Sequence, residues 1–158
     1  MVRKGTTLVP TLYIFYAILH HGRQSNMNEA ALSTSRRIFD RHIASFQRAM
    51  RAGVPIAMGS DCGNAVTEHG TNAFELELMV RYGMSPMNAL LSATRDAARA
   101  LRLSDSLGTL EAGKLADLLV VDGDPLAEIA LLQDEARIRL VMKEGKPIDC
   151  TLKYEIVP

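Results

Sequence analysis

The stretch from Gly53 to Asp61, Gly-Val-Pro-Ile-Ala-Met-Gly-Ser-Asp, constrains the fold of this chain more than any other. Its apolar run, residues 54–58, is typical of a short strand buried on both faces, as in a parallel sheet. Gly59 and Ser60 allow a sharp turn, and Asp61 then delivers one carboxylate. Parallel α/β barrels hold their sites at the carboxyl ends of strands, so Asp61 is placed to bind a metal or move a proton. An aspartate after Gly-Ser is also a common turn former and helix N-cap, and this segment alone leaves both interpretations open.

A helix is predicted over residues 28–51, directly before this strand. Its apolar side chains recur at helical spacing and fall on one face; they are Phe39, Ile43, Phe46 and Met50. Gly53 stands where a left-handed helix cap is expected. A second buried strand is predicted over residues 7–10, passing into a loop or helix. Strand, helix and strand with short joints form the crossover unit of a parallel α/β fold.

Three further helices follow in the sequence. The first starts with Asn72 and Glu75, which are spaced as a capping box, and stops at Gly83. The second opens at Ser85-Pro86, with the serine as N-cap and the proline at the first helical position. The third begins near Thr94. All of them continue the α/β pattern.

The character of the sequence changes after residue 104, where glycines punctuate short apolar runs. Residues 115–121 and 138–142 are predicted to be strands, and Glu144-Gly145 indicates a tight hairpin beyond the second of them. Residues 114–117 are interpreted as a structural turn into the first strand. The last third of the chain is therefore predicted to be a small β region.

Composition restricts the class of partner. Lys plus Arg number 18 and Asp plus Glu number 18, so no basic excess is available for phosphates and no nucleic-acid partner is expected. Cys62 and Cys150 make no disulfide framework and fit a reducing compartment, which favours a cytoplasmic protein. The apolar run 8–19 follows Arg3 and Lys4 as in a secretory signal, but no small-x-small cleavage site follows, so secretion is the less favoured alternative. The run is too short to span a bilayer, and no membrane partner is expected.

A resemblance to a known family rests on several segments of the chain. They are Leu8-Val9-Pro10-Thr11-Leu12, residues 53–61, Glu68-His69-Gly70-Thr71-Asn72-Ala73 with Glu75-Leu76, Gly83-Met84-Ser85-Pro86-Met87-Asn88-Ala89-Leu90, Ala93-Thr94, and Leu107-Gly108-Thr109-Leu110-Glu111-Ala112-Gly113-Lys114-Leu115-Ala116-Asp117-Leu118. In these segments, which extend over about residues 5–150, the chain resembles the amidohydrolase superfamily. Within it, the chain is most similar to the imidazolonepropionase-like and Xaa-Pro dipeptidase (prolidase-like) group.

The resemblance implies a (β/α)8 TIM-like barrel with a mono- or dinuclear metal centre at its mouth, and a small β-sandwich built from both ends of the chain. Residues 1–104 are then the C-terminal part of the barrel, about its last two strands and their helices. Residues 105–158 are the C-terminal strands of the sandwich. A complete barrel takes about 250 residues, so a chain of 158 residues is expected to be a fragment, a truncated gene product or one subunit. The missing N-terminal barrel segment, or a second chain, is an expected partner.

The resemblance also implies an activity and a metal ligand. The family takes ligands from a His-x-His on the first strand, a Lys or acid on the fourth, histidines on the fifth and sixth, and an Asp on the eighth, and only Asp61 has a counterpart here. The complete enzyme is expected to hydrolyse an amide-type C–N bond of a dipeptide, acylated amino acid or cyclic amide, with a metal-activated water as nucleophile. Asp61 would bind the divalent metal, with zinc expected, and shuttle a proton to the leaving amine. Because a catalytic zinc normally takes three protein ligands, the isolated chain is expected to bind little or no metal and to be inactive.

Other reactive side chains have weaker interpretations. His69, in the loop after the strand, is a candidate substrate-binding residue at the barrel mouth, or orders its own loop; both interpretations stay open. Glu68 is interpreted as a solvated acid, His20-His21 as a surface loop, and His42 as a helix-surface histidine. A thiol mechanism for Cys62 would need a His partner and an orienting group, and the metal interpretation explains the segment better.

A non-catalytic alternative also remains open. Two strands of an α/β piece leave both edges of their sheet unpaired, and such edges pair with other segments or chains. The chain would then be a truncated segment acting as a self-associating interaction module, and a homo-oligomer is expected in either case. An unrelated doubly wound domain is disfavoured, because no Gly-rich phosphate loop follows a predicted strand.

Overall fold

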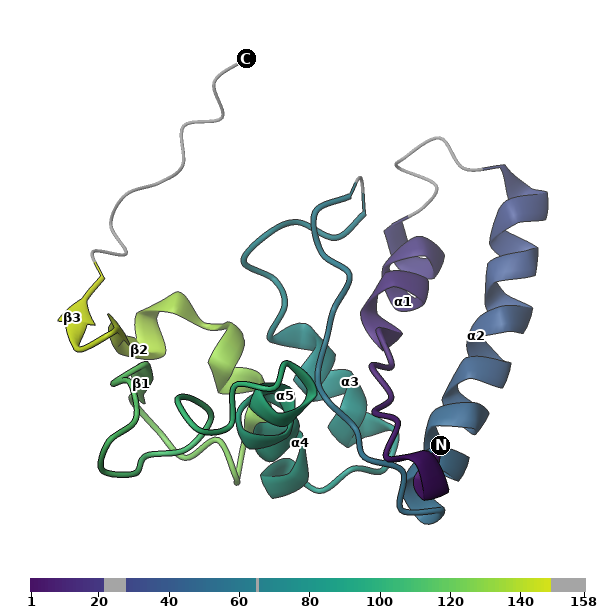
Figure 1. The fold of residues 1–158 in the computed structure, drawn as a ribbon. Helices are drawn as coiled ribbons and strands as arrows, with labels where there is room; N and C mark the ends of the chain where they lie inside the picture. The colour runs from purple at the N-terminus through teal and green to yellow at the C-terminus, as the bar shows by residue number, and fades with distance from the viewer. Residues whose placement is uncertain (22–27, 65, 149–158) are drawn as a thin grey trace.

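The computed structural model describes residues 1–21, 28–64 and 66–148, and Figure 1 shows how their elements are arranged. In chain order the elements are η1 (Val2–Lys4), α1 (Leu12–His21), α2 (Glu29–Arg51), α3 (Phe74–Arg81), α4 (Pro86–Ala93), α5 (Arg95–Ala100), β1 (Leu118–Val121), η2 (Ile129–Gln133), η3 (Glu135–Arg137), β2 (Ile138–Lys143) and β3 (Lys146–Pro147). Within the described part of the chain, no helix has the length and apolar character to cross a membrane. Cys150 lies outside the described residues.

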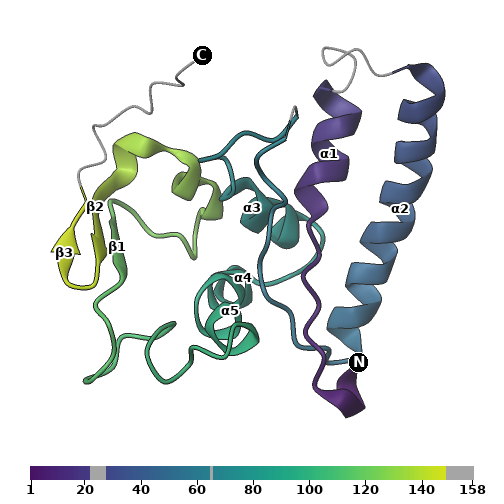
Figure 2. The same cartoon turned by 45° about the horizontal axis from the view of Figure 1, so that its top comes forward.

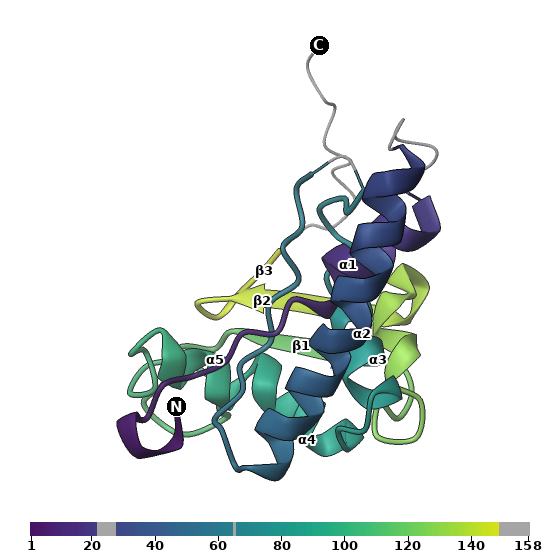
Figure 3. The same cartoon turned by 90° about the vertical axis from the view of Figure 1, so that its right-hand side faces the viewer.

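The two predicted parallel strands lie side by side but pair over a single bridge, between Leu8 and Ile56. The Leu8 N–H donates to the Pro55 carbonyl (2.8 Å), and the Ala57 N–H donates to the Leu8 carbonyl (3.0 Å). Ile56 is 7% exposed and Ala57 2%, so both faces of this segment are covered, as its sequence predicts. Figure 3 shows the two extended segments beside the helices. We call residues 7–10 and 54–58 the parallel pair.

Helix α2 has the ends that its sequence predicts. Asn28 caps it by accepting the Ala31 N–H (2.9 Å). At the other end Gly53 has φ 67°, and the Val54 N–H donates back to the Ala49 carbonyl (3.0 Å), which is the Schellman pattern that turns the chain into the next strand. α2 stands beside α1 as an antiparallel neighbour (Figure 2).

The core lies where α1 packs between α2 and α3. Its largest fully buried apolar side chains come from all three helices and are Leu12, Phe46, Leu78 and Met79. The Tyr16 ring on α1 meets Phe39 of α2 edge-on, with centroids 6.4 Å apart, and Phe74 of α3 at 5.0 Å. The predicted apolar stripe of α2 therefore faces α1, with Phe39 and Phe46 buried and Ile43 and Met50 half-buried.

The predicted capping box at the start of α3 is wrong. The N-cap of α3 is Ala73, which makes no side-chain cap hydrogen bond. Glu75 is instead fully buried, and its two carboxylate oxygens accept the Leu12 N–H (2.9 Å) and the Tyr13 N–H (2.7 Å). The first amides of α1 have no partner within their own helix and are removed from water, so they require an acceptor from elsewhere. Glu75 caps α1 rather than the helix on which it lies.

Two histidine interpretations are also corrected. His20 and His21 end helix α1 instead of forming a loop, because the apolar face of α1 continues to Leu19; the following Gly22 lies outside the described residues. The His20 ring stacks on Tyr16 at 4.1 Å. His42 is half-buried rather than on the helix surface, since its ring packs edge-on against Phe15 of the neighbouring helix at 5.6 Å.

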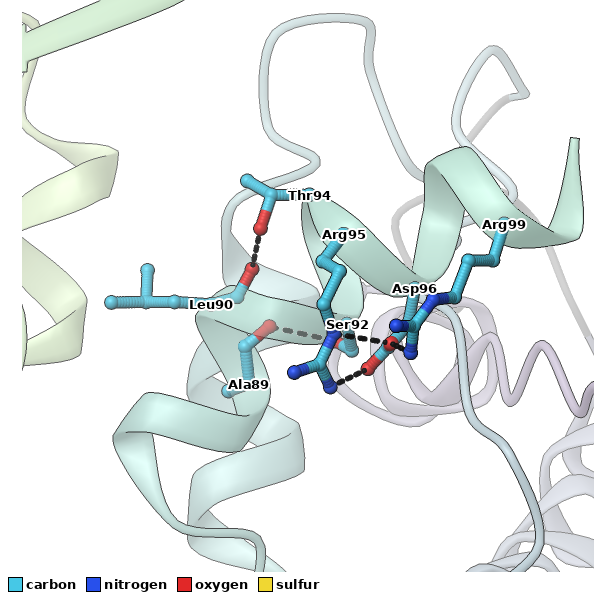
Figure 4. A network of polar contacts seen from close by, with 7 residues as sticks. All are labelled: Ala89, Leu90, Ser92, Thr94, Arg95, Asp96 and Arg99. Carbon is cyan, nitrogen blue, oxygen red and sulfur yellow. Dashed lines mark hydrogen bonds and ion pairs between the residues drawn. The ribbon is translucent and has the colours of Figure 1, made fainter. Parts of the chain in front are cut away.

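Helices α4 and α5 anchor the second segment of the parallel pair. Ser85 caps α4 as predicted, accepting the Asn88 N–H. The Met58 N–H donates to the carbonyl of Ser92, which is 1% exposed (3.0 Å). Figure 4 shows the polar network around this junction, in which the hydroxyls of Ser92 and Thr94 donate to the carbonyls of Ala89 (2.6 Å) and Leu90 (2.8 Å), and Asp96 pairs with Arg95 and Arg99.

The β region forms one antiparallel sheet in the order β1-β2-β3. The predicted hairpin is confirmed: Glu144 (φ 51°) and Gly145 (φ 76°) are both left-handed, as in a type I′ turn. Asp117 accepts the Glu144 N–H (2.7 Å), so the turn before β1 is tied to the hairpin. Gly108 joins this region to α5, since a Cβ there would lie 2.6 Å from the Ala98 Cβ and 3.0 Å from the Thr94 carbonyl oxygen.

We predict that Gly59→Ala disturbs the parallel pair. The added Cβ would lie 2.5 Å from Val9 Cγ1, and overpacking of this kind lowers the free energy of unfolding by about 1–3 kcal/mol, which urea denaturation would measure. In Gly59→Ala/Val9→Ala the clashing atom is gone and the new Cβ lies 4.0 Å from the Val9 Cβ. The double variant should therefore be more stable than the sum of the two single changes. Additive effects would contradict the register of the pair.

Candidate functional site

Each segment of the parallel pair is followed by a left-handed residue that is not glycine. Thr11 has φ 48° and stands three positions beyond Leu8; Asp61 has φ 55° and stands five positions beyond Ile56. Because the pair is parallel, both residues lie at the same edge, which we call the carboxyl edge. A positive φ is unusual for any side chain and most costly for a β-branched one such as threonine. Strained backbone of this kind gathers at functional sites, so the carboxyl edge is the candidate site.

The backbone of Asp61 is held by the loop that follows it, residues 61–71, here named the Asp61 loop. The Asp61 carbonyl accepts the side-chain N–H of Asn64 (2.8 Å) and the hydroxyl of Thr67 (3.0 Å). Asn64 also donates to the Thr67 hydroxyl (2.6 Å) and accepts the Thr67 N–H (3.2 Å). Thr67 is fully buried, whereas the Asp61 side chain belongs to an exposed residue. The loop therefore fixes the Asp61 main chain and leaves its carboxylate at the surface of this chain.

His69 lies on the same loop and packs on Gly63. A Cβ at Gly63 would lie 2.8 Å from His69 Nε2, so the ring covers the main chain two residues after Asp61. His69 is exposed and lines a hollow of about 650 Å³ between α1, α3 and the segment of η2 and η3. The other residues lining this hollow are Tyr13, Tyr16, Glu68, Gly70, Thr71, Phe74, Leu132, Gln133, Glu135 and Ile138. Asp61 does not line this hollow. The two predicted site residues therefore lie on the same loop but in different surroundings, His69 at the hollow and Asp61 at the exposed surface.

The other reactive residues of the Asp61 loop, Cys62 and Glu68, make local contacts within the loop. Cys62 is a half-buried free cysteine whose sulfur lies 3.8 Å from the Thr71 hydroxyl. Glu68 is exposed, as its interpretation as a solvated acid requires, and its carbonyl accepts the Thr71 hydroxyl (2.7 Å). A second hollow of about 510 Å³ includes Val54 and Asn88 and lies at the amino end of the parallel pair, opposite the carboxyl edge.

Comparison with known proteins assigns the chain to a family. The sequence model of the amidohydrolase family matches residues 1–148. The chain belongs to the amidohydrolase family. Among curated relatives, it is 42% identical to the imidazolonepropionase of Aromatoleum aromaticum over 89 residues, which cover 56% of this amidohydrolase chain and 22% of the relative. It is 30% identical to the ochratoxinase of Aspergillus niger over 148 residues, covering 92% of the chain and 30% of the relative.

Solved structures place this amidohydrolase chain within a larger fold of mixed helices and strands. A Xaa-Pro dipeptidase with bound methionine in its active site superposes with a TM-score of 0.82 at 34% identity, over 94% of the chain and 36% of that protein. The A. niger ochratoxinase superposes with a TM-score of 0.77 at 30% identity, over 93% of the chain and 33% of that protein. The chain thus spans about a third or less of these relatives.

Members of this family are generally metal-dependent, so the donor atoms of this chain bear on whether it holds a metal centre. A catalytic zinc takes about three protein ligands, commonly His, Asp, Glu or Cys. Over residues 1–21, 28–64 and 66–148, no three such side chains lie close enough together to hold an ion. Asp61 offers one carboxylate at the carboxyl edge, and His69 lines a hollow that Asp61 does not reach. The donors of the described residues therefore do not fit a complete metal centre.

Two features near the carboxyl edge were not predicted from the sequence: the hydrogen bonds of Glu75 to the start of α1 and the left-handed conformation of Thr11. The sequence did carry a signal for the first: Glu75 shares a helix face with Leu78 and Met79, three and four positions later, which are fully buried. Burial raises the pKa of Glu75 to about 7, although the N–H groups of Leu12 and Tyr13 oppose the rise. The left-handed Thr11 had no sequence signal, because threonine is not a residue type that favours this conformation.

We predict that the Thr67 hydroxyl holds the Asp61 main chain. Thr67→Val keeps the shape of the buried side chain but removes the group bonded to both Asp61 and Asn64. The free energy of unfolding, measured in urea, should fall by about 1–2 kcal/mol because buried polar partners are left unpaired. Thr71→Val is the matched control; its exposed hydrogen bond to the Glu68 carbonyl should contribute less than about 0.5 kcal/mol. Equal losses in both variants would contradict this role of Thr67.

Proposed function

We propose that the parallel pair forms the last two strands of a (β/α)8 barrel, with residues 1–104 belonging to the barrel and residues 105–158 to a β-sandwich. The parallel bridge between Leu8 and Ile56 supports this proposal, because it joins two segments separated by the long helix α2. The antiparallel sheet β1-β2-β3 supports a separate β region. Residues 149–158 lie outside the described part of the chain.

The function that the geometry supports best is hydrolysis of an amide-type C–N bond by an assembled amidohydrolase. One observation carries this proposal: a left-handed aspartate, Asp61, follows the strand at the carboxyl edge of a chain from the amidohydrolase family. The substrate class is a dipeptide, an acylated amino acid or a cyclic amide, and the similarity to a Xaa-Pro dipeptidase supports the dipeptide. The free thiol of Cys62 suits a reducing, cytoplasmic compartment.

Each predicted site residue has a role in this proposal. Asp61 is the one ligand that the described residues contribute to a divalent metal centre, with zinc expected, whose other ligands come from an N-terminal barrel segment or a second chain. The Asp61 carboxylate also accepts a proton from the attacking water and returns it to the nitrogen of the leaving amine. His69 contacts the part of the substrate that reaches the hollow beside the Asp61 loop.

A second candidate function is favoured by the open edges of the parallel pair. Within the described residues, the segment around Leu8 forms its bridge with Ile56 alone, and the neighbouring Val9 side chain is 48% exposed. Unpaired edges of this kind recruit further strands. On this interpretation the chain is a self-associating interaction module without catalysis.

The catalytic proposal is tested by completing the barrel. Co-expression of the chain with the N-terminal half of a related hydrolase, supplied with zinc, should release amine from dipeptides, acylated amino acids or cyclic amides. Asp61→Asn should lower the rate by about 10²-fold or more, because the proton acceptor is lost. Asparagine tolerates the left-handed backbone that Asp61 adopts (φ 55°), so the loss would report the carboxylate rather than the turn.

The control for this experiment is Asp105→Asn, at an exposed position in the loop after α5. It should leave the rate within twofold of the parent, on the expectation that surface substitutions cost roughly 0.5 kcal/mol or less. Full activity of the Asp61→Asn hybrid would remove Asp61 from the reaction.

The module proposal predicts self-association of the 158-residue chain by itself. Size-exclusion chromatography with light scattering should give a mass above that of a single chain of 17.3 kDa. Val9→Lys should shift the chain toward the monomer, because a lysine on an open strand opposes further pairing. Leu110→Lys, at a side chain that is 82% exposed and away from the pair, should leave the mass unchanged. A stable monomer for the parent chain would contradict self-association.

A further inference from the structure

The turn from the first strand into α1, residues 10–13, is held by α3 and lies beside α2. We call this turn the α1 junction. From α3, the carboxylate of Glu75 accepts the N–H groups of Leu12 (2.9 Å) and Tyr13 (2.7 Å). On the α2 side, the half-buried ring of His42 lies near the Pro10 carbonyl, which opposes the lowering of the His42 pKa by burial. Thr11, the left-handed residue, lies between these two contacts.

The Glu75 contact is strong because of where it lies. Glu75 has no exposed surface, so water does not compete for the two amides. The N-terminus of a helix carries a partial positive charge, which favours an anionic acceptor. A carboxylate with two oxygens satisfies both amides at once, and a neutral side chain of the same shape satisfies one. The geometry of the α1 junction therefore depends on the charge of one buried group.

We propose that Glu75 is a positioning residue of the carboxyl edge: by binding the first two amides of α1, it holds Thr11 in the left-handed conformation and so sets the end of the strand beside Asp61. The functional importance of the carboxyl edge rests on the proposed function, but the positioning of Thr11 by Glu75 does not. Leu8 and Ile56 are paired, and Thr11 and Gly59 each lie three positions after one of them, so Thr11 and Gly59 stand at the same level along the parallel pair. The Val9 side chain already meets the main chain at Gly59, so a shift at the junction is passed to the residues that carry Asp61.

The surroundings of Glu75 make this contact dependent on pH. Its pKa is raised to about 7 by burial, with the two N–H groups acting in the opposite direction. The titratable or charged residues of α1 are Tyr13, Tyr16, His20 and His21, and those of α3 besides Glu75 are Glu77 and Arg81. Helix α2, which packs against α1, carries Glu29, Arg36, Arg37, Asp40, Arg41, His42, Arg48 and Arg51. Protonation replaces one acceptor oxygen by a hydroxyl, which weakens the hold on one amide. The folded chain binds this proton more tightly than the unfolded chain does, so global stability falls as pH rises from about 4.5 to about 7, while the hold on the α1 junction strengthens.

The experiment uses the whole chain and measures its backbone amides by nuclear magnetic resonance. In the parent chain the amide signals of Leu12, Tyr13 and Thr11 should titrate together with a midpoint near pH 7, and those of Gly59 and Asp61 should follow with the same midpoint. Glu75→Gln keeps one acceptor and mimics the protonated state, so the titration should disappear. At pH 8 the Leu12 and Tyr13 amides should exchange about tenfold faster than in the parent, the change expected for about 1.4 kcal/mol of lost hydrogen bonding.

Glu77→Gln is the matched control, because Glu77 lies on the same helix but pairs with Arg81 (2.5 Å) toward the surface. It should leave the titration intact and change the exchange rates less than twofold. If Glu75→Gln fails to fold, the titration of the parent chain decides the question by itself. The proposal is overturned if the junction amides do not titrate, or if they titrate while Gly59 and Asp61 do not. None of these readings uses catalysis, so a failure of the proposed hydrolysis would be recognised separately.

Discussion

The buried contact between the Glu75 carboxylate and the first turn of α1 is the constraint on which the arrangement of the helices depends. Removing a carboxylate from water costs several kcal/mol unless charge and hydrogen bonds compensate for it. Here the compensation comes from two main-chain amides, which themselves lack partners within their helix. Each side of the contact therefore requires the other, and α3 is fixed relative to α1. The aromatic contacts of Tyr16 with Phe39 and Phe74 add packing to a geometry that this polar contact selects.

The parallel pair depends on its helices more than on its own hydrogen bonds. A single bridge joins its two segments, so most of their extended backbone is positioned by neighbouring elements. The Schellman turn at Gly53 delivers one segment from α2, and the Ser92 carbonyl accepts the Met58 N–H near its other end. Gly59 then lets the segments approach closely at Val9. Such an arrangement suits a sheet whose strands make most of their pairings with other parts of a larger protein.

The elements of the fold were predictable wherever local chemistry decides them. The apolar stripe of α2, the Ser85 cap and the hairpin at Glu144-Gly145 follow from spacing and backbone preference, and all are confirmed. Glu75 was misassigned because a capping box and a tertiary cap use the same residue type, and the choice between them depends on a helix 62 or 63 positions away in the sequence. The extent of the two strands was overestimated for the same reason, since strand pairing is a long-range property. The roles of Asp61 and His69 rest on resemblance and stay predictions.

The structure restrains the main chain of Asp61 but not its carboxylate. Its main chain needs a rigid left-handed turn, which the side chains of Asn64 and Thr67 supply through its carbonyl. Its carboxylate belongs to an exposed residue, and no described neighbour restrains it by a hydrogen bond or ion pair. The Asp61 loop therefore orders the backbone while leaving the acid exposed. Under the proposed function, this carboxylate would become a metal ligand only once the other ligands of the centre are supplied.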